Sequence, residues 1–153
     1  MKKIKIGDII EVSTTKGLRY AQFSHRHLKY GTLVRILPNF FKLRPSEFSE
    51  VINCPETFVT FFPLQAAVNQ KIFTLVANYP VPDFAKNFPL FRCGIPDPIT
   101  RKVKTWWFWD GEKEWQVGDI TTEQRKLPLR EIWNDTLLVE RIESGWTPSN
   151  DNE

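Results

Sequence analysis

The sequence is poor in the residues that build redox centres, metal sites and phosphate-binding loops. Its 153 residues include two cysteines, two histidines and seven glycines, and the glycines never form a Gly-x-Gly run. Two cysteines make no disulfide framework, and a zinc site needs about four ligands, or three with an open position. The usual glycine-rich phosphate loops are also excluded. We therefore expect neither a metal nor a cofactor.

Long apolar runs are absent too. No stretch of about 18 apolar residues could span a membrane, and residues 1–8 lack the apolar core and cleavage site of a signal peptide. Cys54 and Cys93 then fit two reduced thiols. We expect a cytoplasmic protein with no membrane partner.

The sequence also lacks a recognisable catalytic set. No serine lies in a glycine-flanked elbow, and neither cysteine begins a nucleophile motif. Glu112 and Glu114 fit a solvated strand face. His25 and His27 alternate on a strand, so their imidazoles point the same way, and they fit a polar strand end better than a metal pair. We predict that the chain is not an enzyme, unless folding brings a histidine beside a cysteine or a carboxylate in a cleft.

Charge is distributed unevenly along the chain, although the net charge is only +3. Residues 1–44 hold ten Lys or Arg against two Asp or Glu, residues 45–130 hold ten against ten, and residues 131–153 hold one against six. The basic start and the acidic end either neutralise each other in the fold or form a patch that steers a partner of opposite charge.

Runs of β-branched and aromatic residues between turn residues predict a mainly β fold. Strands at 7–13, 18–24 and 32–37, joined by short links, would form a meander that curls into a small, partly open barrel. The apolar run at 58–62 predicts a central strand, and 72–77 predicts another buried strand.

The remaining segments predict short helices and one long loop. Helical turns are expected at 45–51 and 63–70. Five prolines within 80–98 predict a structured loop with one short strand near 90–93, because proline cannot donate to a strand ladder. A last helix is expected at 134–145, begun by an asparagine cap and ended by a glycine.

Four of the six tryptophans lie within ten residues, at 106–115, around an Asp-Gly pair that predicts a hairpin. We expect one face of this hairpin to be core. The other, beside two glutamates, is either covered by a second element or exposed as a contact surface. Strand alternation assigns the first face Trp106, Phe108, Trp115 and Val117, and the second face Trp107 and Trp109.

These patterns predict the fold class α+β, mainly β. We expect a single domain over 1–146, with a curled antiparallel sheet or a partly open small barrel and two or three short helices, including a C-terminal one. We expect 147–153 to be a flexible C-terminal tail.

Both ends of the chain carry a family resemblance. The segments KIGDIIEV (5–12), KGLRYAQFS (16–24) and YGTLVRI (30–36) resemble the opening of the immunity protein 26 family of bacterial polymorphic toxin systems. The segment WWFWDGEKEW, the following Leu-Pro pair and the closing helix with Glu-Arg-Ile are similar to that family's tail. The middle of the chain is not covered, and the proline-rich stretch departs most.

The resemblance implies a mainly β cytosolic protein that binds and blocks a cognate toxin by stoichiometric occlusion. It supplies no catalytic motif and no fixed contact positions. Tryptophans often anchor interfaces, and acidic side chains could mimic phosphate toward a toxin that is a basic nuclease. The sequence does not define the oligomeric state. The partner-binding candidates are Trp107, Trp109, Asp110, Glu112, Glu114, Glu131, Asp135, Glu140 and Glu143.

Nucleic acid is the alternative partner. The basic first 44 residues interleave Lys and Arg with aromatic residues, and small barrels bind single strands by stacking bases on aromatics above a positive groove. The sequence lacks the Gly-Phe submotifs of RNA-recognition sheets. The aromatic candidates for this alternative are Tyr20, Phe23, Tyr30, Phe40 and Phe41.

Overall fold

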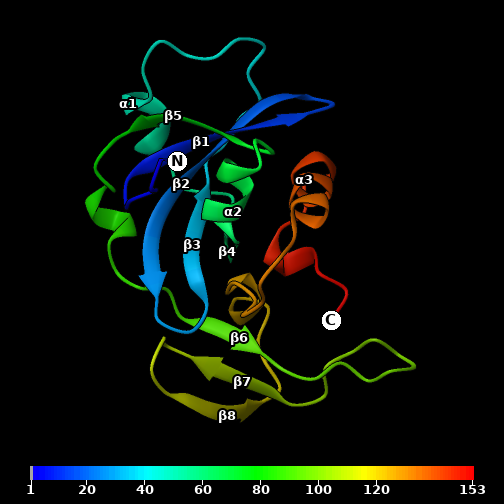
Figure 1. Ribbon diagram of the computed structural model, residues 1–153. Helices are drawn as coiled ribbons and strands as arrows, with labels where there is room; N and C mark the ends of the chain where they lie inside the picture. The colour runs from blue at the N-terminus through cyan, green and yellow to red at the C-terminus, as the bar shows by residue number, and fades with distance from the viewer. Residues whose placement is uncertain (1) are drawn as a thin grey trace.

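Two antiparallel β-sheets organise the chain, in a computed structural model that describes residues 2–153 (Figure 1). The larger sheet has the strand order β4-β3-β2-β1-β5 and the smaller sheet the order β6-β7-β8. The strands of the larger sheet are β1 (Asp8–Thr14), β2 (Gly17–His27), β3 (Gly31–Ile36), β4 (Phe58–Phe61) and β5 (Thr74–Asn78). Those of the smaller sheet are β6 (Phe91–Cys93), β7 (Trp106–Trp109) and β8 (Glu114–Gly118).

Short helices connect and cover the strands. They are α1 (Ser49–Ile52), α2 (Leu64–Asn69) and α3 (Asp135–Ser144), with single 3₁₀ turns at Asp83–Ala85, Gln124–Lys126 and Pro148–Asn150. Within residues 2–153, no helix has the length and apolar character needed to cross a membrane. The fold class is therefore confirmed: mainly β, with helices that include a C-terminal one.

Helix α3 has the predicted ends. The side chain of Asn134 accepts a hydrogen bond from the Leu137 N–H at 2.8 Å, which satisfies one of the free donors of the first turn. Gly145 ends the helix with φ of 72°, a left-handed conformation that glycine adopts without steric cost. Leu138 and Ile142 are buried, as their spacing predicts.

The larger sheet is covered on both faces. Ile9 and Ile10 are both fully buried because strand alternation sends them to opposite faces, and each face has its own apolar cluster. One cluster joins β1, β2 and β3 to the apolar sides of α2 and α3. The other joins β1, β2 and β5 to α1. The meander is confirmed as an open sheet rather than a closed barrel.

Two strand predictions are wrong, one in position and one in burial. The apolar β4 lies at an edge of the sheet, not in its centre, and its outer side is covered by the chain at Ile132 and Trp133, whose N–H donates to the Phe61 carbonyl at 3.1 Å. Strand β5 forms the opposite edge and is only half-buried. The β4 sequence looks central because the chain at Ile132 and Trp133, not a further strand, covers its outer side.

An aromatic cluster joins the two sheets. Leu33 and Phe61 of the larger sheet pack with Phe91 and Trp109 of the smaller sheet, and the rings of Phe61 and Phe91 stack with centroids 5.3 Å apart. Phe88, from the predicted proline-rich loop, lies against both. The short strand predicted in that loop is β6. Trp109 therefore serves as a structural link between the sheets.

The segment 147–153 is packed against the fold, which differs from the predicted flexible tail. Pro148 is buried, and its carbonyl accepts a hydrogen bond from the buried Arg92 guanidinium at 2.6 Å. The Asp151 carboxylate accepts from the Trp146 indole at 3.0 Å. The polar composition of the segment suggested fraying, but its partners lie far away in sequence or in the preceding helix.

Candidate functional site

The tight turn of the β7–β8 hairpin is fixed by Asp110. Trp109 pairs with Glu114, so the loop between the two strands has four residues, 110–113. The Asp110 carboxylate accepts from the N–H groups of Lys113 at 2.8 Å and Glu112 at 2.9 Å. These two hydrogen bonds hold the pKa of Asp110 below its ordinary value. Gly111 is required at its position because φ is 104° and a Cβ would lie 2.9 Å from the Phe88 ring.

The predicted alternation of the hairpin is confirmed, but burial does not follow it. Phe108 lies opposite Trp115, and Trp107 lies opposite Gln116. On the first face Trp106 and Phe108 are buried, whereas Trp115 is 42% exposed because it stands on the outermost strand. The prediction that Trp115 is core is therefore wrong.

The two tryptophans of the second face differ in burial. Trp109 is only 5% exposed and packs against the rings of His27, Tyr30 and Phe91. It therefore offers little surface to a partner, although it lines a hollow described below. Trp107, two residues earlier on the same face, is 36% exposed. Trp107 therefore remains a candidate contact residue, whereas Trp109 is buried where the two sheets meet.

His27 holds this hairpin against the larger sheet. Its Nε2 lies 2.7 Å from the Gly111 carbonyl, and its Nδ1 accepts from the N–H groups of Lys29 at 3.1 Å and Tyr30 at 3.2 Å. Two backbone donors at Nδ1 assign the proton to Nε2, which donates to Gly111. His25 reaches the Lys86 carbonyl at 2.8 Å. Both histidines thus tie loops together, and residues 2–153 contain no group of three or more His, Cys, Asp or Glu placed to hold a metal.

A groove of about 660 Å³ opens beside Trp107. Cys93 and residues of the loop 94–105 line it, together with an ion pair in which the Arg130 guanidinium donates to Glu114 at 2.8 Å. Burial raises the pKa of the Cys93 thiol, which disfavours the nucleophilic thiolate. We name this cavity the Trp107 groove.

A second hollow of about 390 Å³ lies across the same ion pair. His27, Tyr30 and Glu112 line it, and it shares Glu114 and Arg130 with the Trp107 groove. The Arg130 guanidinium also lies over the rings of Trp109 and Tyr30, at 5.3 and 5.8 Å from their centroids. The ion pair is therefore held on a rigid aromatic base in the middle of an elongated concave surface.

The loop 94–105 carries two exposed isoleucines, of which Ile95 lines the Trp107 groove. Ile95 is 90% exposed and Ile99 is 91% exposed. The loop is nevertheless ordered by its own contacts: the Asp97 carboxylate accepts from the N–H groups of Ile99 and Thr100, at 2.8 and 3.0 Å, which lowers its pKa. Lys102 and Lys104 line the groove on this side. A fixed loop with exposed isoleucines suits contact with a second protein.

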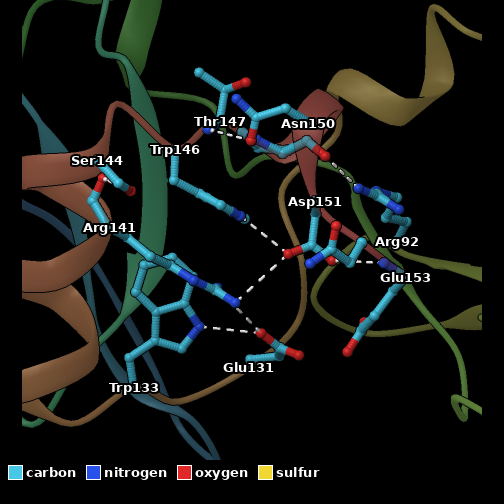
Figure 2. Close-up of polar contacts among 12 residues, drawn as sticks. Arg92, Glu131, Trp133, Arg141, Ser144, Trp146, Thr147, Asn150, Asp151 and Glu153 are labelled. Atoms are coloured by element: carbon cyan, nitrogen blue, oxygen red, sulfur yellow. Dashed lines mark hydrogen bonds and ion pairs between the residues drawn. The ribbon is translucent and has the colours of Figure 1, made fainter. Parts of the chain in front are cut away.

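The acidic candidates do not form one surface. Glu131 faces inward, where it accepts from the Trp133 indole at 3.1 Å and lies 3.8 Å from Arg141 (Figure 2). The Arg141 side chain also reaches Asp151 and lies over the rings of Trp133 and Trp146. Both ion pairs of the acidic end use Arg141 of the same segment, and within residues 2–153 no ion pair joins this end to the basic residues 1–44, so mutual neutralisation of the two ends is not seen.

The other acidic residues differ in what they contact. Glu143 is engaged, since its carboxylate accepts from the N–H and hydroxyl of Thr15 at 2.7 and 2.8 Å, which lowers its pKa. Asp135 and Glu140 lie on α3, which Figure 1 shows well away from the hairpin. Only Asp110, Glu112 and Glu114 of the acidic candidates lie beside the exposed tryptophan face.

The sequence did not predict Arg130, Ile95 or Ile99 as site residues. Arg130 has no local signal, because its partners come from β8 and from the turn before β3. Ile95 had a usable signal, since it lies within the proline-rich stretch 80–98, where strand pairing is disfavoured.

The aromatics proposed for nucleic-acid stacking are mostly structural. Tyr20 and Phe23 are buried in the two apolar clusters of the larger sheet. Two of the basic residues of this region, Arg19 and Arg35, are also buried and donate to neighbouring groups within the fold. These four side chains are not available to a nucleic acid.

No protein-family model, curated protein or solved structure matches this chain. The resemblance to the immunity protein 26 family stays a prediction from the sequence.

Proposed function

We propose that this chain is a non-enzymatic immunity protein that binds a cognate bacterial toxin and blocks it by stoichiometric occlusion. The family resemblance of both chain ends supports the role. The observation that carries the proposal is the partly exposed Trp107 in a groove of about 660 Å³, bordered by an ion pair and an ordered loop with exposed isoleucines.

Each part of this surface has a function in protein recognition. Tryptophan and arginine are the residue types most enriched at binding hot spots, particularly in pockets that lose their water on association. Trp107 would supply the anchor, and Arg130 would present a guanidinium already positioned by Glu114 and Trp109. Ile95, which lines the groove, would add apolar contact area.

The acidic hairpin residues give the proposal its link to a nuclease. Glu112 and Glu114 line the second hollow together with Lys29 and Arg130, so a basic nucleic-acid cleft would meet a carboxylate in place of a phosphate chiefly at Glu112, beside the hairpin turn. Because Glu114 is paired with Arg130, Glu112 carries the larger part of this attraction. We therefore place the toxin over the hairpin and not over α3.

Co-expression tests the proposal. The gene that neighbours this one and encodes a candidate toxin is expressed with and without this chain, and growth and complex formation on gel filtration are measured. Rescue of growth together with a stable equimolar complex is expected. Unchanged toxicity with no complex would refute the immunity role.

The hairpin supplies a matched pair of variants for the same experiment. Trp107→Ala removes the proposed anchor, whereas Trp115→Ala removes a tryptophan of similar exposure from the opposite face. We expect Trp107→Ala to weaken the complex by about a hundredfold, the size of a hot-spot loss, and Trp115→Ala to leave it nearly unchanged. Equal effects of the two variants would contradict the placement of the toxin.

A further inference from the structure

The loop 94–105 is attached to the rest of the fold at few points. Figure 1 shows it extending away from the smaller sheet between β6 and β7. Its internal hydrogen bonds centre on Asp97, whose N–H donates to the Lys102 carbonyl and whose carbonyl accepts from the Arg101 N–H, both at 2.8 Å. Among residues 2–153, one hydrogen bond joins 95–104 to another part of the chain: the Lys102 ammonium donates to the Asn152 carbonyl at 2.6 Å.

The segment that carries this acceptor is itself fixed to the fold. The Arg125 guanidinium donates to the carbonyls of Asp151 and Glu153, at 3.1 and 3.3 Å. The Asp151 carboxylate accepts from the Trp146 indole at 3.0 Å and lies 3.5 Å from the Arg141 guanidinium (Figure 2). The chain is thus held immediately before and immediately after the residue that the loop contacts.

The same segment supports the ion pair of the groove through Arg92. The Arg92 guanidinium is fully buried and donates to the Pro148 carbonyl at 2.6 Å. Burial lowers the pKa of Arg92, whereas the carboxylates of Asp151 and Glu153 act in the opposite direction and stabilise its charge. The Arg92 carbonyl accepts from the Arg130 N–H at 3.1 Å. The segment therefore contacts the loop directly and reaches the ion pair through β6.

We propose that the segment 147–153 is a latch that holds the loop 94–105 in position beside the Trp107 groove. Lys102 closes the turn that begins at Asp97 and also makes the bond to Asn152, so release of that bond frees the turn to open. A partner that binds the groove of a released protein must order the loop first, which lowers its affinity. The effect on a partner rests on the proposed function, whereas the latch is a property of the protein alone.

Two lysines of the loop provide a matched comparison. Lys102 and Lys104 both line the Trp107 groove and are both exposed. The Lys102 ammonium reaches Asn152, whereas the Lys104 ammonium has no hydrogen bond or ion pair within residues 2–153. A change at Lys104 therefore alters the charge of the loop but leaves the latch intact.

Amide hydrogen exchange of the protein without toxin tests the latch. Lys102→Met keeps a side chain of similar length but removes the donor to the segment 147–153. The N–H groups of Ile99, Thr100 and Arg101 should then exchange about fivefold faster, because the turn opens more often. Lys104→Met should leave their exchange unchanged. Unchanged exchange in Lys102→Met, or equal acceleration by both variants, would overturn the proposal.

A second pair of variants tests the latch from its other side. Arg125→Ala removes the donor to Asp151 and Glu153 without touching the loop, and it should also accelerate exchange at 99–101. Lys126→Ala is the control on the same 3₁₀ turn, because its ammonium pairs with Glu123 instead. The amides of β2, which should exchange as in the wild type, report that the fold is intact. No acceleration in a folded Arg125→Ala would contradict the coupling.

Toxin affinity is measured separately, by calorimetry with the candidate toxin encoded by the neighbouring gene. Arg125→Ala lies outside the Trp107 groove and should weaken binding by about threefold, the cost of ordering a released loop. Faster exchange with unchanged affinity would overturn the role of the latch in binding. If the wild type binds no toxin, the proposed function fails, while the exchange result still decides the latch.

Discussion

The larger sheet and the smaller sheet differ in how much of their surface the chain itself covers. Both faces of the larger sheet are covered by apolar clusters, whereas the smaller sheet leaves Trp107, Trp115 and the β8 edge exposed. Arginines show the same contrast: Arg35 is fully buried, and Arg130 stays partly exposed at the groove. The difference indicates that the larger sheet maintains the fold, and it supports the proposal that the smaller sheet presents the contact surface.

The largest loss of stability is expected at Arg35. Its guanidinium donates to Glu56 at 2.9 Å, to Gln22 at 2.7 Å and to the carbonyls of Ile52 and Cys54. Arg35→Ala leaves buried acceptors without donors and should lower the free energy of unfolding by about 3 kcal/mol, as measured in urea. Arg130→Ala is the control in the smaller sheet and should cost much less. Equal losses would remove the distinction between the sheets.

A smaller loss is expected at His27, where the two sheets meet. His27→Ala removes hydrogen bonds to Gly111, Lys29 and Tyr30 and should lower the free energy of unfolding by about 2 kcal/mol. His25→Ala is the matched control and should cost less, since one of its two polar contacts is with the adjacent Ser24. A larger effect at His25 would show that the joint between the sheets lies elsewhere.

Local sequence patterns predicted the helices and strands better than they predicted which elements lie next to each other. The meander, the capped last helix and the hairpin alternation follow from residue periodicity and turn chemistry, and each is confirmed. The edge position of β4 depends on the chain near Trp133, more than seventy residues away, for which no local pattern exists. The sequence could not predict that Trp109 is buried while Trp107 is exposed, since both lie on one face and only their distance from the larger sheet differs.

The smallest effect is expected from pH at the hairpin turn. The folded-state pKa of Asp110 is lowered, so its stabilisation is present above the unfolded value and is lost as pH falls through the folded value, below about pH 4. Asp110→Asn keeps an acceptor for the two N–H groups without the charge. The wild type should therefore be more stable than Asp110→Asn near neutral pH, and the difference should shrink in acid. A difference that does not change with pH would contradict the charged turn.

The most direct test of the proposed contact surface is the affinity of the Trp107→Ala and Trp115→Ala variants for the candidate toxin encoded by the neighbouring gene. Both affinities are measured by calorimetry. The two tryptophans have similar exposure and lie on opposite faces of one hairpin. Loss of about a hundredfold in affinity at Trp107, with nearly unchanged affinity at Trp115, is the predicted result. Unchanged affinity at Trp107 would contradict the assignment of the smaller sheet as the contact surface.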